Sequence, residues 1–194
     1  MKRTPAEAYT ELIRREKEIA LLESCASLLH WDHQTYIPSK GAAHRAEQLA
    51  LLAGLSHEQS TDPVIGELLA EAESRDLTRE EGSPAAVNLR EIRRTYDRTR
   101  KLPRSLVEEL ARTTALAHEV WVEARRTSAF AVFEPWLEKI VALKRQEAEA
   151  VGYREVPYDA LLDEYDVSPE KLQQDLDALL SKLVEHGLLQ VNNE

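Results

Sequence analysis

Three side chains that could bind a metal ion lie close together near residue 30. His30, Asp32 and His33 fall within four positions of the chain, and imidazole and carboxylate groups are common ligands of zinc-like ions. Three ligands crowded at one helix end rarely close a metal shell by themselves. In the alternative, structural interpretation, Trp31 is a buried aromatic residue whose indole N–H finds a partner, and Asp32 fixes the turn that follows. We expect the structural interpretation to hold.

Two other histidines begin a zinc-binding motif that neither completes. Two imidazoles on one helix aim at a single metal ion when they are four positions apart, as in the motif HExxH. Residues 57–61 begin with His-Glu but have threonine at the second His position, and residues 118–122 have valine there. His44 and His186 are isolated and are interpreted as surface or cap residues. The sequence therefore predicts no metal ligand and no catalytic residue in residues 1–194.

The composition argues against several classes of protein. The formal net charge is −10, with acids and bases interleaved, which disfavours nucleic acid as a partner because phosphate binding needs clustered Lys and Arg. The densest basic run, residues 90–101, is interpreted mainly as a solvated helix face. No apolar run approaches a membrane span and no signal peptide is evident, so we expect a cytoplasmic protein without a membrane partner. Cys25 is the single cysteine, and we expect it to be buried as a small apolar residue.

The amino-acid pattern predicts an all-α protein. The chain has only six glycines, and its apolar residues recur at helical spacing among abundant Ala, Leu, Glu and Arg. Thr4 can cap the first helix, Pro5 suits its first position, and Glu7 completes a capping box. The apolar face of this helix continues to Trp31, and Pro38 prevents further extension.

Helical hairpins with short joints make up the rest of the expected architecture, without a strand. Helices are expected at about residues 42–55, 61–69, 84–102, 104–124, 137–152, 158–165 and 168–186. A polar break is expected at residues 74–82, and a corner over residues 128–135 should contain Pro135 because proline interrupts helices. Gly152 suits the end of the helix that follows. We expect a single helical domain over residues 1–194, built as an array of antiparallel hairpins.

The last expected helix carries a leucine stripe. Leu172, Leu176, Leu179 and Leu183 recur at helical spacing within residues 168–186. We expect this stripe to pack on the earlier helices, so that replacing Leu176 by alanine would cost roughly 2–5 kcal/mol.

Several stretches, in their order and spacing, resemble one known family. They are Leu29-His30-Trp31-Asp32 with Thr35 and Pro38; Arg45-Ala46-Glu47-Gln48-Leu49; Leu89-Arg90-Glu91 through Tyr96-Asp97 to Lys101-Leu102-Pro103; Trp121 with Ala124-Arg125; Phe130, Phe133 and Pro135; and Tyr158-Asp159-Ala160-Leu161-Leu162-Asp163. Together they resemble the N-terminal helical portion of the carboxypeptidase Taq family of metal-dependent carboxypeptidases. The sequence departs from the family pattern at Ala129, where an acidic residue is usual, and at residues 166–168.

The resemblance implies a fold and a chemistry for longer relatives. Members of this family are almost wholly helical and usually homodimeric, and they remove C-terminal amino acids from peptides. They hold zinc or cobalt with the two His of an HExxH helix and a downstream Glu, and the metal activates water for attack on the peptide bond. Residues 1–194 match the portion that precedes this motif. We therefore expect no cofactor in this chain, and we assign structural roles to the family-motif positions His30, Trp31, Asp32, Thr35, Pro38, Tyr158 and Asp159.

Two functional hypotheses follow from the resemblance. In the first, the chain is a truncated or relic form of such a peptidase and is inactive alone. In the second, it is a helical binding or regulatory module, or one subunit of a split peptidase. Its partner would then be a second copy or a separate catalytic-half protein, because apolar faces without a covering segment usually find one.

Overall fold

The computed structural model describes residues 3–162 of the chain. The chain forms two compact units, Met1–Val151 and Gly152–Glu194, and each is considered by itself. Residues 3–162 contain helices and no strand, so the predicted all-α class is confirmed. The single domain expected over residues 1–194 stays a prediction.

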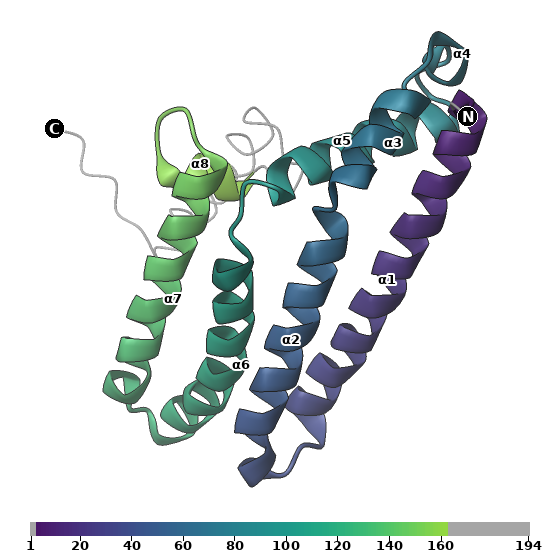
Figure 1. Cartoon of the computed structure of the whole chain (residues 1–194). Coiled ribbons are helices and arrows are strands. Elements are labelled where there is room, and N and C mark those ends of the chain that lie inside the picture. The colour runs from purple at the N-terminus through teal and green to yellow at the C-terminus, as the bar shows by residue number, and fades with distance from the viewer. Residues whose placement is uncertain (1–2, 163–194) are drawn as a thin grey trace, which may run out of the picture. The chain divides into compact units, whose positions relative to one another are not determined.

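The first unit is a layer of long helices with shorter ones at one end. Its elements are α1 (Pro5–Thr35), the 3-10 turn η1 (Ser39–Gly41), α2 (Ala42–Ser60), α3 (Pro63–Ala72), α4 (Arg75–Thr78), α5 (Pro84–Thr99), α6 (Arg104–Thr127) and α7 (Phe130–Val151). The long helices α1, α2, α6 and α7 lie side by side in that order, each antiparallel to its neighbour (Figure 1). Helices α3 and α5 contact each other near the start of α1. Antiparallel hairpins are thus the arrangement found here.

The starts of three helices follow the signals in the sequence. The Thr4 backbone N–H donates to the Glu7 carboxylate at 2.8 Å, and the Glu7 backbone N–H donates to the Thr4 hydroxyl at 3.3 Å, which completes the predicted capping box. The side chains of Asp62 and Ser83 accept backbone N–H groups at the starts of α3 and α5, and each is followed by proline.

Two apolar clusters hold the helices of this unit together. The first joins α1, α3 and α5, and its buried members are Ala8, Leu12, Ile65, Leu68, Leu69, Ala72, Leu89 and Tyr96. The second lies between α2 and α6 and consists of Ala46, Leu49 and Ala115, with Ala26 and Leu29 of α1 packed against it. The small alanine side chains let these long helices approach closely.

The α6–α7 corner is shorter than the sequence indicates. We expected a corner over residues 128–135 with the helix starting after Pro135, but α7 begins at Phe130 and contains Pro135. Ser128 alone makes the sharp turn, with a φ of 54° in the left-handed region, and the Ala129 N–H donates to the Ala124 carbonyl at 2.8 Å. Pro135 lies within two turns of the start of α7, so its missing N–H costs one early helical bond.

Two other expectations differ from the structure in this unit. The polar break at residues 74–82 contains the short helix α4. Cys25 is exposed on α1, so the prediction that it is buried was wrong. Its position in a helical pattern did not fix which face of α1 turns toward α2.

The second unit is described over residues 152–162, where α8 (Pro157–Leu162) forms. Gly152 follows the end of α7 with a φ of 87°, as expected for a helix-ending glycine. The Asp159 carboxylate accepts the backbone N–H groups of Glu155 and Val156 at 3.2 Å and so caps the turn before α8. Tyr158 is exposed. The expected leucine stripe of residues 168–186 lies outside the described residues.

Candidate functional site

Arg45 ties the end of α1 to the start of α2. One nitrogen of its guanidinium, Nη1, lies 2.6 Å from Asp32 Oδ2 and donates to the Leu29 carbonyl oxygen at 2.7 Å, while Nε donates to Gln48 Oε1 at 2.9 Å. The Arg45 side chain is largely buried. Two of the stretches that carry the family resemblance therefore meet in a single ion pair, and the carboxylate of Asp32 has a structural partner.

His33 joins α1 to α6. Its side chain is 2% exposed, and its Nε2–H donates to the Ala115 carbonyl oxygen at 3.0 Å. Its Nδ1 is buried and has no hydrogen-bond partner among the described residues. The ring lies 5.8 Å from that of His118, which in turn lies 5.9 Å from the ring of Trp121. His33 therefore belongs to the contact between the two helices.

His30 has a different hydrogen-bond partner from His33. The Gln34 amide, one turn later on α1, approaches His30 Nε2 at 2.8 Å. Burial lowers the pKa of His30, and the neighbouring rings of His33 and His118 lower it further. A neutral imidazole is thus favoured at this position.

These contacts separate the three side chains that could have bound a metal ion. Asp32 is paired with Arg45, His33 donates to the Ala115 carbonyl of α6, and His30 contacts Gln34. Over residues 3–162, no group of three or more His, Cys, Asp or Glu side chains is placed to hold a metal ion. The described residues do not fit the metal centre that the family implies.

Trp31 is not the buried residue that the structural interpretation requires. Its side chain is 54% exposed and packs edge-to-face on Tyr36, with ring centroids 5.4 Å apart. The prediction of a buried Trp31 was wrong because His33, two positions later, takes the inward face of α1. Successive residues of a helix point about 100° apart, so only one of the two can face α6. Thr35 and Pro38 end the segment, since the Thr35 hydroxyl donates to the Trp31 carbonyl and α1 stops before the proline.

The two incomplete HExxH stretches lie on different helices. His57, on α2, is buried, and burial lowers its pKa against the opposing effect of a hydrogen bond to the Leu102 backbone. The hydroxyl of Thr61, at the second His position of that stretch, donates to the His57 carbonyl at 2.7 Å. His118 lies on α6 beside His33. Neither stretch belongs to a metal-binding group in the described part of the chain.

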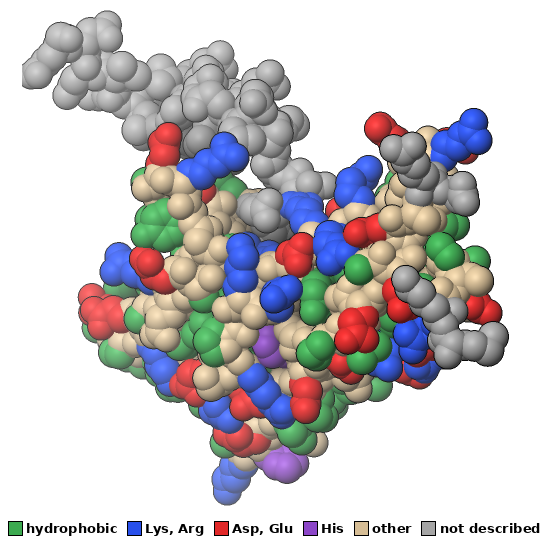
Figure 2. All heavy atoms as spheres, turned by 45° about the horizontal axis from the view of Figure 1, so that its top comes forward, with side chains coloured by type: hydrophobic (Ala, Val, Ile, Leu, Met, Phe, Trp, Pro, Cys, Tyr) green, Lys and Arg blue, Asp and Glu red, His purple; other side chains and the backbone are tan. Residues whose placement is uncertain are grey.

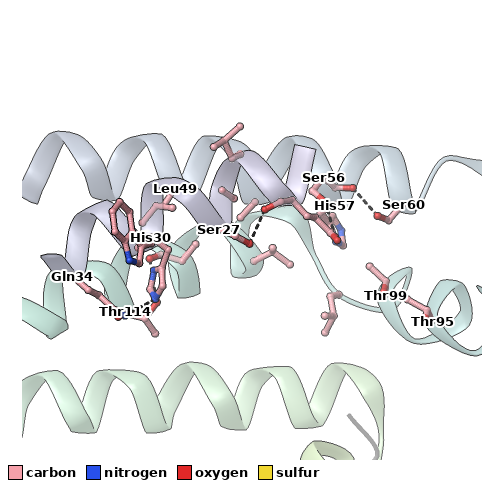
Figure 3. A pocket seen from close by; sticks show the side chains of 18 residues that line it. Ser27, His30, Gln34, Leu49, Ser56, His57, Ser60, Thr95, Thr99 and Thr114 are labelled. Atoms are coloured by element: carbon pink, nitrogen blue, oxygen red, sulfur yellow. Dashed lines mark hydrogen bonds between the residues drawn. The ribbon is translucent and has the colours of Figure 1, made fainter. Parts of the chain in front are cut away.

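A groove lies on the layer of long helices beside Trp31 and His30. It has a volume of about 740 Å³. Helix α1 contributes Glu23, Ala26, Ser27, His30, Trp31 and Gln34; α2 contributes Leu49, Leu52, Ala53, Ser56, His57 and Ser60; Thr95, Thr99, Leu102, Val107, Ala111 and Thr114 come from α5, α6 and the joint between them. Figure 3 shows His30 and Gln34 at one end and His57, Thr95 and Thr99 toward the other. Ser56 donates to the Glu23 carboxylate at 3.1 Å across the groove.

Charged side chains on the surface are mixed in sign. Blue and red side chains alternate over the face in Figure 2 without a large area of one sign. The basic run at residues 90–101 is partly internal, because Arg98 pairs with the buried Glu147 of α7 at 3.3 Å, and Arg93 pairs with Glu73 at 2.8 Å. No helix within residues 3–162 is both long enough and apolar enough to cross a membrane.

Comparison with known proteins places the chain in a family. The family model for the carboxypeptidase Taq (M32) metallopeptidases matches residues 11–192. Thermostable carboxypeptidase 1 of Thermus thermophilus is 40% identical over 198 residues, which cover 96% of this chain and 38% of the relative. The crystal structure of BsuCP has a TM-score of 0.79 at 27% identity, over 92% of this chain and 35% of that chain.

A further solved structure agrees with these matches. The M32 carboxypeptidase of Deinococcus radiodurans has a TM-score of 0.66 at 29% identity, over 92% of this chain and 36% of that chain. The chain thus spans well under half the length of the relatives it matches. It belongs to the carboxypeptidase Taq (M32) family of metallopeptidases.

Proposed function

We propose that residues 1–194 supply the N-terminal helical portion of a metallocarboxypeptidase fold and are catalytically inactive alone. The observation that carries this proposal is the coverage, since 96% of this chain matches only 38% of the Thermus thermophilus carboxypeptidase. The absence of HExxH from the 194 residues supports it. So do the separate structural partners of His30, Asp32 and His33.

The activity of the complete fold is part of this proposal. In it, residues elsewhere in the fold would hold a divalent metal, which would supply Lewis-acid activation of water for release of the C-terminal amino acid of a peptide. Residues 1–194 act by holding helices in place through contacts such as Arg45–Asp32, and they donate no group to the metal.

An assay of the purified chain tests the inactivity. The chain is incubated with N-blocked dipeptides and added zinc or cobalt, with the Thermus thermophilus carboxypeptidase as the positive control. We expect no metal-dependent release of the C-terminal amino acid by the chain. Release that is removed by a chelator, and that copurifies with the chain, would contradict the proposal.

Exposed apolar side chains support a second candidate, a helical binding module. Leu21 and Leu28 lie seven positions apart on α1 and are 67% and 64% exposed, and Leu51 of α2 is 57% exposed. Apolar residues that recur on one helix face favour association with a second copy or with a separate catalytic-half protein. Sedimentation at micromolar concentration tests self-association, and a monomer at all concentrations would count against it. The cytoplasmic location stays a prediction.

A further inference from the structure

The groove between α1, α2 and α6 is built from small and apolar side chains. Alanine, serine and threonine make up half of its lining residues, and Leu49, Leu52 and Val107 supply larger apolar groups. Small side chains let the backbone of another element come close, because packed helices lie 8–10 Å apart only when the side chains between them allow it. The lining therefore suits a bulky regular element.

The groove also has the length of a few helical turns. Its α1 wall extends from Glu23 to Gln34, which at 1.5 Å per residue is about 16 Å, or three turns. Trp31 stands at one end with more than half of its side chain exposed. Exposed tryptophans at the edge of an apolar groove are typical anchors of protein interfaces.

The helical walls of the groove favour a helix over an extended peptide as the occupant. The long walls come from helices, whose backbone N–H and C=O groups bond within each helix. An extended peptide would find few backbone partners there, and each buried unpaired group is costly. A helix satisfies its own backbone and needs only apolar contacts.

The charge of the lining points to an apolar occupant. Glu23 is the one carboxylate among the lining residues, and there is no Lys or Arg. Burial lowers the pKa of both His30 and His57, which favours their neutral forms. The groove therefore has no Lys or Arg to pair with an acidic helix, and its larger apolar groups, Leu49, Leu52 and Val107, suit the apolar face of a helix.

We propose that this groove is the docking site of an apolar helix from the catalytic portion of the carboxypeptidase Taq fold. The inference rests on the proposed function, because the helix that would occupy the groove belongs to the part of the relatives that this chain does not match. That part is more than half of each relative, and the fold of the family is all-α. The occupant lies over Ser27, Ala53 and Ala111 with Trp31 packed against one end.

Two matched cysteine variants test the docking. Ser27 lines the groove and Ser24 lies outside it on the same helix; both side chains are exposed, and each hydroxyl donates to a carbonyl of α1. Each serine is replaced by cysteine in a Cys25→Ser background, and the rate of reaction with a thiol reagent is measured. The two variants are compared in the isolated chain and in a chimera. In the chimera, this chain replaces the aligned stretch of the Thermus thermophilus carboxypeptidase.

We expect the Ser27→Cys thiol to react freely in the isolated chain and at least about tenfold more slowly in the chimera. The Ser24→Cys thiol should react alike in both. Equal reactivity of the Ser27→Cys thiol in chain and chimera would overturn the docking. Protection that requires an added blocked dipeptide would do so too, by assigning the groove to peptide substrate.

Protection of the Ser27→Cys thiol already in the isolated chain would also overturn the inference. If the protection of the thiol increased with protein concentration, a second copy would cover the groove; if it did not, another segment of this chain would. A chimera that cleaves peptide while this thiol stays reactive would refute the docking and leave the proposed function standing. If the chimera does not fold, cysteines at the two aligned positions of the Thermus thermophilus enzyme itself give the same readout.

Discussion

Arg45 connects three groups that lie on both sides of the α1–α2 joint. It contacts the Asp32 carboxylate, the Leu29 carbonyl and the Gln48 amide. Hydrogen bonds that involve a charged group contribute about 1.5–3 kcal/mol when they are shielded from water. Since Asp32 is partly exposed, the net effect of losing Arg45 should lie near the lower end of that range.

We therefore predict that Arg45→Met lowers the free energy of unfolding by about 1.5–2 kcal/mol, measured by urea denaturation. Arg90→Met is the matched control, because Arg90 is exposed and pairs with the adjacent Glu91. The control should change stability by less than about 0.5 kcal/mol. Equal effects of the two substitutions would show that the Arg45 contacts do not stabilise the joint.

The buried His57 makes stability depend on pH. Burial holds the pKa of His57 below its ordinary value of 6.5, so the unfolded chain takes up a proton at a higher pH than the folded chain. Stability from the neutral imidazole is complete above pH 6.5 and is lost as the pH falls from there through the folded pKa.

We predict that the thermal midpoint falls between pH 7.5 and pH 5, and that His57→Gln makes this fall shallower. His44→Gln, at an exposed position of the same helix, is the control and should leave the slope unchanged. His30 has a pKa shifted in the same direction, so part of the slope should remain in the His57 variant. An unchanged slope in His57→Gln would contradict the assignment.

At the scale of residues, the sequence predicted which segment carries the notable side chains, but it did not predict which groups those side chains contact. The segment around residue 30 was found, but the inward residue is His33 and the exposed one is Trp31. Hydrophobicity ranks tryptophan as the buried residue, whereas the position of Ala115 and His118 of α6 beside His33 decides the outcome. The same argument applies to Cys25. The pairing of Asp32 with Arg45 depends on the α1–α2 joint and could not be read from either stretch alone.

At the scale of elements, α3 and α5 approach closely at Gly66. A Cβ atom at Gly66 would lie 2.8 Å from the Tyr96 hydroxyl oxygen and 3.1 Å from two ring carbons. Tyr96 is buried in the α1–α3–α5 cluster, and its ring has little room to move. Glycine at this position therefore serves the contact between the two helices.

We predict that Gly66→Ala destabilises the protein by about 1–2 kcal/mol, because overpacking outweighs the gain of about 1 kcal/mol in helix propensity. Removing the hydroxyl with Tyr96→Phe should reduce the cost of Gly66→Ala in a double-mutant cycle. Gly82→Ala, where an added Cβ meets nothing within 4 Å, is the control. A stabilising Gly66→Ala would refute the close approach.

Element starts were more predictable than corners. Thr4, Asp62 and Ser83 cap helices through local side-chain contacts, and local signals of this kind are visible in the sequence. The prediction of the α6–α7 corner was wrong because Pro135 lies inside α7 and does not mark its start. A non-glycine residue, Ser128, adopts the left-handed conformation there, and no local pattern marks it.

At the scale of the whole molecule, the family relationship was recognised from dispersed short stretches, and the all-α class from the helical spacing of the apolar residues. The groove could not be predicted, since it needs the spatial order of α1, α2 and α6. The packing expected for the leucine stripe of residues 168–186 stays a prediction. By our proposal, residues 1–194 are the N-terminal portion of a metallocarboxypeptidase fold whose metal site lies elsewhere in that fold.

Activity of the chimera with the Thermus thermophilus carboxypeptidase is the sharpest test of this proposal. In it, residues 1–194 replace the stretch to which they are 40% identical, and release of the C-terminal amino acid from a blocked dipeptide is measured with and without chelator. We predict metal-dependent release by the chimera and none by residues 1–194 alone. A folded, metal-loaded chimera that releases no amino acid would contradict the account.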